Sequence, residues 1–159
     1  SFAHEQISHL RMGREKANQN LENFEIVSTI PIVPGRDLEM CANLVRPYAA
    51  LYVGGMGSKE KNFYNALAVR MGYEKEAALV QEKYLAKDYE AAMMALPFDF
   101  LDQTSLLGGP DRMAEKMQEH AAAGVTTLAL ALPDSVPYEA RIRGLRMAVE
   151  ALEKSGVGE

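Results

Sequence analysis

The chain has 159 residues and a mass of 17.5 kDa, which is the size of one domain. It is 48% hydrophobic and 25% charged, so a disordered or low-complexity chain is excluded. Its formal net charge is −5 and its basic residues do not cluster, which excludes a nucleic-acid partner held through phosphate contacts.

The cysteine content and the hydropathy pattern bear on metal binding, cellular location and membrane association. Cys41 is the single cysteine, so no internal disulfide can form, and no Cys/His set has the spacing of a metal site. We therefore expect no metal and a cytoplasmic location. No apolar run approaches the length of about 18 residues that spans a membrane, and no signal peptide opens the chain, so we expect no membrane partner. The chain begins without Met at the edge of a helical pattern, which predicts a truncated or processed product.

The first elements in chain order are a helix and a strand. Helix formers over 3–20 predict a surface helix, and the β-branched segment 24–33 predicts a strand with Phe24, Ile26, Ile30 and Ile32 on one face. Pro31 lacks an N–H, which predicts that the strand ends there or becomes an edge strand.

The next segment has a helical pattern. Asp37 is the expected cap of a helix through Leu51, interrupted at Pro47, and Ser58 is the expected cap of a helix through Met71. Shorter helices follow over 74–85 and 88–96, and 97–109 reads as an irregular loop.

The last third repeats the helix-and-strand pattern. Pro110 suits the first position of a helix that Gly124 ends, with Met113, Met117, His120 and Ala121 as its buried stripe. The nearly continuous apolar run 125–132 is typical of a parallel strand covered on both faces, and 138–154 predicts a final helix.

These elements leave the second strand without enough neighbours. A buried parallel strand needs partners on both edges and helices on both faces, and this chain supplies at most one partner. We therefore expect the other strands to come from elsewhere: from the missing N-terminal half, or from another copy in a homo-oligomer.

The glycine cluster Gly54-Gly55-Met56-Gly57-Ser58-Lys59 is the most conspicuous motif. It fails the spacing of a Walker loop and of a dinucleotide fingerprint. Two readings stay open: a turn between helices with glycines at positive φ, or an active-site loop. Around it, the tyrosines and phenylalanine of 46–52 and 62–64 are typical either of a pocket for a planar ligand or of helix–helix contacts. No Ser, His or Cys arrangement supplies a catalytic nucleophile.

The order of these residues resembles one family. The run Arg46-Pro47-Tyr48-Ala49-Ala50-Leu51-Tyr52-Val53-Gly54-Gly55-Met56-Gly57, then Asn62-Phe63-Tyr64 and Arg70-Met71-Gly72-Tyr73, is similar to the latter half of luciferase-like flavin- and deazaflavin-dependent oxidoreductases. The segments Thr104-Ser105-Leu106-Leu107-Gly108 and Ala123-Gly124-Val125-Thr126-Thr127-Leu128 resemble the same family, and the likeness extends over roughly residues 20–132.

The resemblance implies an α/β fold that is the carboxy-terminal part of a (β/α)₈ TIM barrel, lacking its N-terminal strands. Segments 24–33 and 125–132 would be strands seven and eight, 1–159 a single partial domain, and 34–109 a helical insertion within it. The implied function is transfer of hydride or oxygen between a deazaflavin (coenzyme F420) or FMN and a small organic substrate, and the fragment alone would be inactive. The expected cofactor-binding residues are Gly54, Gly55, Met56, Gly57, Asn62 and Tyr64, and no catalytic residue is assigned. The alternative is a non-catalytic oligomeric scaffold or interaction module derived from a half barrel.

Overall fold

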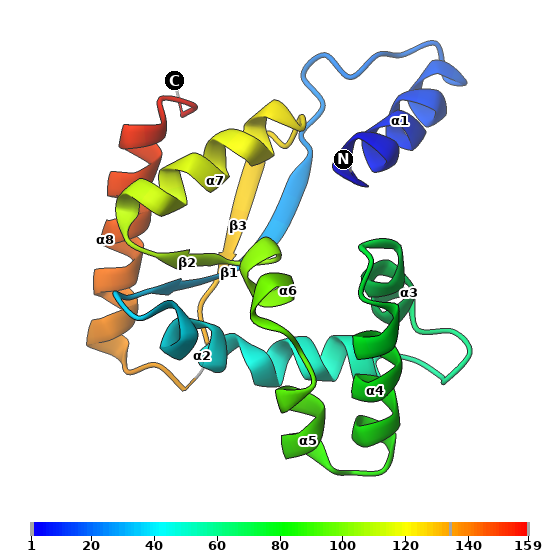
Figure 1. Ribbon diagram of the computed structural model, residues 1–159. Coiled ribbons are helices and arrows are strands. Elements are labelled where there is room, and N and C mark those ends of the chain that lie inside the picture. The colour runs from blue at the N-terminus through cyan, green and yellow to red at the C-terminus, as the bar shows by residue number, and fades with distance from the viewer. Residues whose placement is uncertain (1, 134, 159) are drawn as a thin grey trace.

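A three-stranded parallel sheet with helices around it organises the computed structural model, which describes residues 2–133 and 135–158. The strands are β1 (Val27–Pro34), β2 (Leu106–Gly108) and β3 (Thr127–Ala131), in the order β2-β1-β3. Figure 1 shows that the carboxyl ends of β1 and β3 point toward α2 (Leu38–Ala50). The predicted α/β class is confirmed.

β1 is the central strand, and Pro31 lies inside it. Its residues Val27–Pro31 pair with β3, whereas Ile32–Pro34 pair with β2. The prediction that Pro31 ends the strand or makes it an edge is therefore wrong. Its missing N–H falls where one ladder stops and the other starts, so the proline interrupts neither run of paired residues. The strand also begins three residues later than the predicted Phe24.

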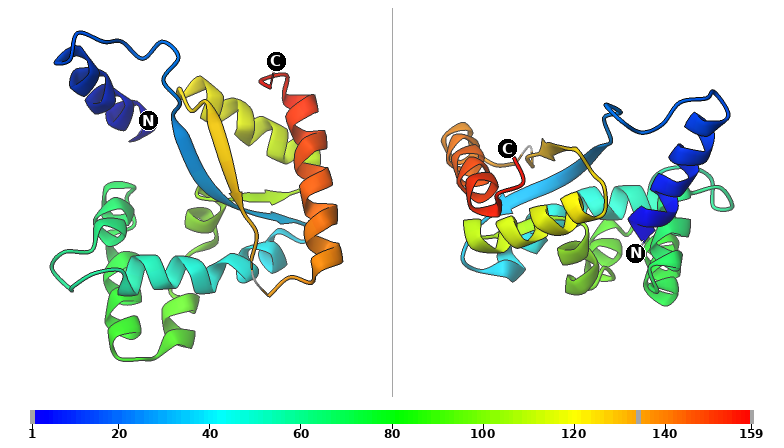
Figure 2. Two further views of the ribbon diagram at one scale, coloured as in Figure 1. Left: turned by 180° about the vertical axis from the view of Figure 1, so that it is seen from behind. Right: turned by 90° about the horizontal axis from the view of Figure 1, so that it is seen from above.

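One face of the sheet is covered by two long helices, α7 (Pro110–Ala122) and α8 (Tyr138–Ser155). Figure 2 shows both helices against the strands when the molecule is seen from behind. Ile30 and Ile32 of β1 are buried there, as the alternation of the sequence predicts. They pack in one apolar cluster with Leu106, Met113, Met117, Ala148 and Ala151.

β3 departs from its predicted burial. All five of its residues are half-buried, although the apolar run predicts a strand covered on both faces. Within residues 2–133 and 135–158 it pairs with β1 alone, and its other edge faces no strand. The expectation that the chain supplies at most one neighbour for this strand is confirmed, and the open edge explains the incomplete burial.

Residues 34–109 hold most of the helices. After α2 come a π-helix, η1 (Leu51–Gly55), and then α3 (Phe63–Arg70), α4 (Glu74–Leu85), α5 (Tyr89–Met94) and α6 (Phe98–Gln103). A second apolar cluster joins them to the end of β1 through buried residues that include Val33, Val45, Val53, Val80 and Leu101. The predicted loop over 97–109 is wrong, because this segment forms α6 and β2. Phe100, Leu101, Leu106 and Leu107 are all buried, so tertiary packing orders a segment whose Pro and Gly residues predict a turn.

The helix ends follow local signals at most positions. The carboxylates of Asp37 and Asp88 accept hydrogen bonds from the backbone N–H groups of Met40 and Ala91. Gly124, at φ +97°, ends α7, and the Val125 N–H donates to the His120 carbonyl as in a Schellman motif. The predicted start at Ser58 is wrong: α3 begins at Phe63, with Asn62 as its N-cap.

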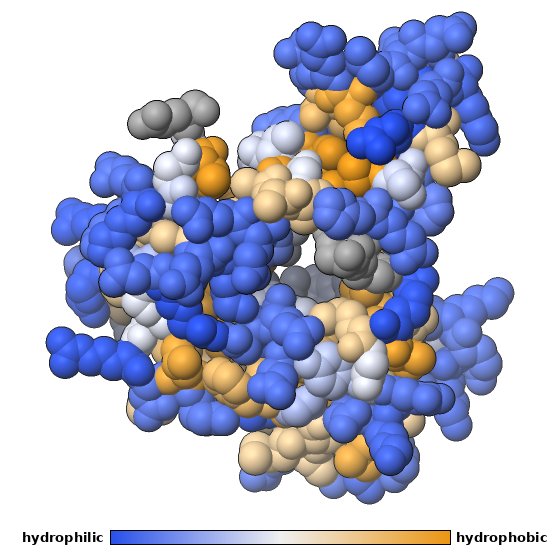
Figure 3. Space-filling view, turned by 45° about the horizontal axis from the view of Figure 1, so that its top comes forward, coloured by the Kyte–Doolittle hydropathy of each residue, from blue (hydrophilic) through white to orange (hydrophobic). Residues whose placement is uncertain are grey.

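α1 (Phe2–Glu15) stands apart from the sheet at the end of a long connecting segment, as Figures 1 and 2 show. Figure 3 shows a mainly hydrophilic surface on which hydrophobic side chains gather in separate patches. Within residues 2–133 and 135–158, no helix combines the length and the apolar character that crossing a membrane requires.

Candidate functional site

Two adjoining cavities lie beside the middle of β1, at Thr29 and Pro31, and the carboxyl end of β3. The larger, here the sheet lobe, has a volume of about 500 Å³. The smaller, here the tyrosine lobe, has a volume of about 200 Å³. Both are lined by Pro31, Val45 and Tyr48, so together they form one groove. Ligands of parallel α/β proteins bind at the carboxyl ends of the strands, and this groove occupies that position at β3.

α2 forms one wall of the sheet lobe. Its residues Leu44, Val45 and Tyr48, followed by Leu51 of η1, recur at helical spacing and line the lobe together with Pro31 of β1 and Ala131 at the end of β3. The tyrosine lobe continues from Tyr48 to Tyr52 of η1, to Tyr64 of α3 and to Phe100 of α6.

The π-helix η1 places Tyr52 in this wall, and two asparagines hold its carbonyls. The Asn62 Nδ2 donates to the carbonyl oxygens of Tyr52 and Val53 at 3.0 Å each. The Asn65 Nδ2 donates to the carbonyls of Val53 at 3.1 Å and Ala77 at 2.8 Å. These bonds tie the widened turn to α3 and α4. Single π-helical turns recur at functional sites because they reposition side chains.

Three tyrosine rings form a continuous array along the tyrosine lobe. The Tyr48 and Tyr52 ring centroids are 4.4 Å apart at an interplanar angle of 37°, and those of Tyr52 and Tyr64 are 4.6 Å apart at 89°. Burial raises the pKa of Tyr48 to about 12, and a hydrogen bond with Tyr52 and the nearby Tyr64 phenol add to the effect. Tyr48 is therefore a neutral phenol at neutral pH, able to donate and accept hydrogen bonds.

The groove carries no charge on the residues that line it in the described part of the chain. Its lining consists of apolar side chains, three tyrosines, Thr29, Thr104 and Ser135. Arg46, on the same helix as Tyr48, is 8% exposed and uses its guanidinium elsewhere. It donates to the carbonyls of Met93, at 3.2 Å, and Leu96, and so holds the end of α5.

Of the six predicted cofactor-binding residues, Tyr64 is the one that lines this groove. Tyr64 lines the tyrosine lobe, and Asn62, 5% exposed, lies behind it as the support of η1. Gly54 and Gly55 end the π-helix against Tyr84 of α4: a Cβ on Gly54 would meet the Tyr84 Cβ at 2.5 Å. Met56 is exposed and only Gly57 of these three glycines has positive φ, at +122°. A cofactor role for these residues stays a prediction.

Sequence reasoning did not place Tyr48 and Tyr52 among the site residues, although they belong to the aromatic cluster that it singled out. Their spacing of four residues puts both rings on one helical face, which is the signal that could have found them. Pro31 and Ala131 were missed because their role depends on strand register.

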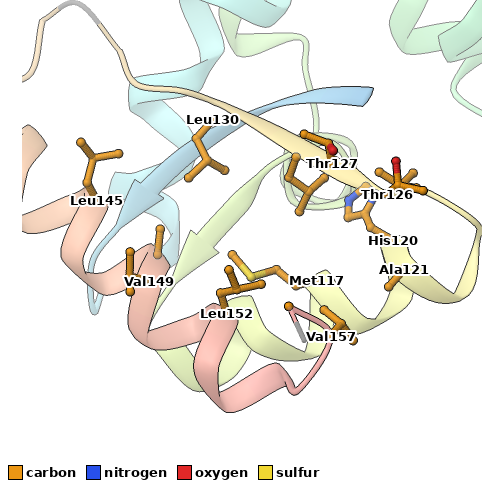
Figure 4. Close-up of a pocket in the computed structure, with 14 residues that line it drawn as sticks. Met117, His120, Ala121, Thr126, Thr127, Leu130, Leu145, Val149, Leu152 and Val157 are labelled. Carbon is orange, nitrogen blue, oxygen red and sulfur yellow. The ribbon is translucent and has the colours of Figure 1, made fainter. Parts of the chain in front are cut away.

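A separate cavity of about 400 Å³ lies between α7, α8 and β3 (Figure 4). Apolar side chains such as Met117, Leu130, Leu145 and Leu152 point into it. Burial and the Lys116 charge lower the pKa of His120, the one titratable residue of its lining among the described residues. This cavity opens beside the unpaired edge of β3 and away from the carboxyl ends, so it is the unfilled margin of the core.

Comparison with known proteins identifies the family. The luciferase-like monooxygenase family matches residues 1–127, and the chain belongs to this family. A Mycobacterium tuberculosis protein named "Putative coenzyme F420-dependent oxidoreductase" is 31% identical over 115 residues, which cover 72% of this chain and 33% of that protein. The chain thus spans about a third of the length of this curated relative. Among the described residues, no group of His, Cys, Asp and Glu is arranged to hold a metal ion.

The packing of Gly54 on Tyr84 predicts the effect of a methyl group. Gly54→Ala should lower the free energy of unfolding by about 1–3 kcal/mol, because the new Cβ overlaps the base of the half-buried Tyr84 ring. Gly13→Ala is the matched control: no atom lies within 4 Å of its Cβ position, and alanine favours the helix interior by about 1 kcal/mol. Urea unfolding of both variants measures the difference, and equal stabilities would contradict the packing.

The hydrogen bonds of Asn62 predict a larger loss. Asn62→Ala removes the N-cap of α3 and the side-chain donor to the carbonyls of Tyr52 and Val53, of which the Val53 carbonyl keeps Asn65, so the free energy of unfolding should fall by about 2–4 kcal/mol. Asn62→Asp keeps the capping acceptor but cannot donate, so it should recover the cap alone and remain less stable than the parent. Full recovery by aspartate in urea unfolding would show that the carbonyl bonds contribute nothing.

The environment of Tyr48 predicts a late phenol titration. Its pKa rises from 10.0 to about 12 on folding, so its contribution to stability is complete below pH 10 and is lost as the pH rises toward 12. In ¹³Cζ-tyrosine NMR one phenol should titrate near pH 12 and disappear in Tyr48→Phe. Tyr138→Phe, at an exposed residue that does not line the groove, should leave this signal in place. Persistence of the signal in Tyr48→Phe would contradict the assignment.

Proposed function

We propose that this chain is part of an oxidoreductase that uses a deazaflavin of the coenzyme F420 type, with FMN as the second choice of cofactor. The observation that carries the proposal is the uncharged, tyrosine-lined groove at the carboxyl end of β3 in a member of the luciferase-like family. The name of the Mycobacterium tuberculosis relative supports F420 over FMN.

The groove is proposed as one wall of the pocket in which cofactor ring and substrate meet. In this arrangement β1 and β3 act as strands seven and eight of a (β/α)₈ barrel, and residues 34–109 as an insertion that reaches over their carboxyl ends. The parallel pairing of β1 with β3 and the family membership support this assignment.

The residues of the groove fit the ring of such a cofactor. Flat aromatic walls favour stacked and edge-on contacts with a planar ring system, and Tyr52 and Tyr64 offer both orientations. The anionic chain that these cofactors carry needs cationic or backbone N–H partners, and the described lining holds no cation. We therefore assign the ring side to this groove and the anionic chain to groups outside it.

The side chains of the groove bind and orient rather than transfer protons at neutral pH. When bound, a deazaflavin supplies or accepts a hydride, and a flavin can also react with oxygen. Tyr48 stays protonated and can hold a substrate oxygen through its hydroxyl, while the leucines and prolines of the sheet lobe exclude water from the reacting atoms. Of the six predicted cofactor residues, Tyr64 is the one whose ring faces the groove, and we keep it as the first to test.

The open edge of β3 favours a second candidate, an interaction module that completes its sheet with other strands. The cavity beside this edge offers apolar surface to an added strand or to another copy of the chain. Completion by further barrel strands belongs to the oxidoreductase proposal, whereas completion by a second copy without cofactor binding defines the scaffold.

Titration of the full-length protein with coenzyme F420 and with FMN, followed by quenching of their fluorescence, tests the proposal. We expect saturable binding of coenzyme F420, weakened about two- to tenfold by Tyr64→Ala, since one aromatic contact contributes about 0.5–1.5 kcal/mol. Tyr89→Ala, which removes an exposed ring on α5, is the control and should leave binding unchanged. Failure of both cofactors to bind, together with concentration-dependent self-association in sedimentation, would favour the scaffold.

A further inference from the structure

We propose that the sheet lobe binds the substrate and selects an uncharged, ring-bearing molecule with a neutral oxygen such as a ketone or an ester, and that it rejects carboxylates and phosphates. The inference rests on the proposed function for the identity of the groove as a substrate pocket. The chemistry of the occupant is argued from the lining alone.

The first argument is electrostatic. The described residues that line the sheet lobe are Pro31, Leu44, Val45, Pro47, Tyr48, Leu51, Ala131, Leu132, Pro133 and Ser135, and none of them is charged. An anion placed there would lose its hydration without gaining a cationic partner, which is the costliest kind of burial. The guanidinium of Arg46 cannot compensate, because the carbonyls of Met93 and Leu96 already occupy it.

The second argument concerns hydrogen bonding. Tyr48 lines both lobes, and 43% of the residue is exposed, so a ligand can reach it. As a neutral phenol it donates readily to a carbonyl oxygen, and Tyr52 beside it can polarise that donor.

The third argument is size and surface. A volume of about 500 Å³ falls in the range of sites that enclose drug-sized ligands, and leucine and proline walls favour flat apolar rings over extended polar chains. A molecule with two fused rings and one carbonyl group fits the volume and offers an acceptor to the Tyr48 hydroxyl.

A pair of nearly isosteric probes tests this inference: 2-acetylnaphthalene, a methyl ketone, and 2-naphthoate, which has a carboxylate in its place. We expect the full-length protein to bind the ketone at least tenfold more tightly than the carboxylate, measured by naphthyl fluorescence and by ¹³Cζ shifts of Tyr48. Tyr48→Phe should weaken the ketone several-fold while changing naphthoate less.

Two lysine substitutions test whether the sheet lobe is the place where the protein distinguishes the ketone from the carboxylate. Leu44→Lys adds a cation to the sheet lobe at a residue 42% exposed, and should reverse the preference by strengthening naphthoate and weakening the ketone. Leu79→Lys adds the same charge on α4 at a residue 43% exposed and outside the lining, and should leave the preference intact. Asp134 adjoins Pro133 in the sequence and lies outside the described residues. Asp134→Asn removes its carboxylate, so a preference for the ketone that survives this substitution arises from the neutral lining.

The outcomes separate this inference from the proposed function. Coenzyme F420 binding together with equal or tighter binding of naphthoate overturns the substrate class alone. Ketone preference in a protein that binds neither F420 nor FMN overturns the proposed function and leaves the lobe as a site for neutral ligands. Identical effects of Leu44→Lys and Leu79→Lys would place the probe outside the sheet lobe and would overturn the inference.

Discussion

The structure depends on the position of β1 between two parallel ladders. Its amino-terminal five residues hold β3, its last three hold β2, and the change of partner falls at Pro31. Because successive side chains of a strand point to opposite faces, Ile30 and Ile32 enter the core under α7 and α8 while Thr29 and Pro31 face the groove. One strand thus anchors both the core and the floor of the candidate site.

Among the features that the sequence predicted correctly are helix ends, which depend on residues close by in the chain. Capping carboxylates at Asp37 and Asp88, the proline that opens α7 and the glycine that ends it are signals within one turn of the chain, and the corresponding helices formed close to expectation. The failures have a common cause. Pro31, the segment 97–109 and the burial of β3 all depend on which distant residues lie alongside, and no local pattern contains that information.

The site shows the same division. The aromatic cluster could be recognised from the sequence, but its arrangement could not, because η1 is a π-helix whose carbonyls depend on Asn62 and Asn65 ten or more residues away. Gly54 and Gly55 were singled out from the sequence either as cofactor-binding residues or as turn glycines at positive φ. Neither has a positive φ, and the cofactor role stays a prediction. The structure shows why both positions are glycine: a Cβ at either one would overlap Tyr84. A glycine cluster beside a groove therefore need not contact a ligand itself.

The groove differs from the cavity between α7, α8 and β3 in how its polar groups are used. This difference favours the groove as the ligand site. The cavity between α7, α8 and β3 is lined mainly by apolar side chains, and within the described residues β3 pairs on one edge alone. The groove, in contrast, is bounded by elements whose polar groups have partners. The carbonyls of Tyr52 and Val53 accept hydrogen bonds from Asn62, and Arg46 donates to backbone carbonyls. The rings of the three tyrosines contact one another. In such a wall the exposed hydroxyls remain available for hydrogen bonds to a ligand, and this property favours the groove as a binding surface.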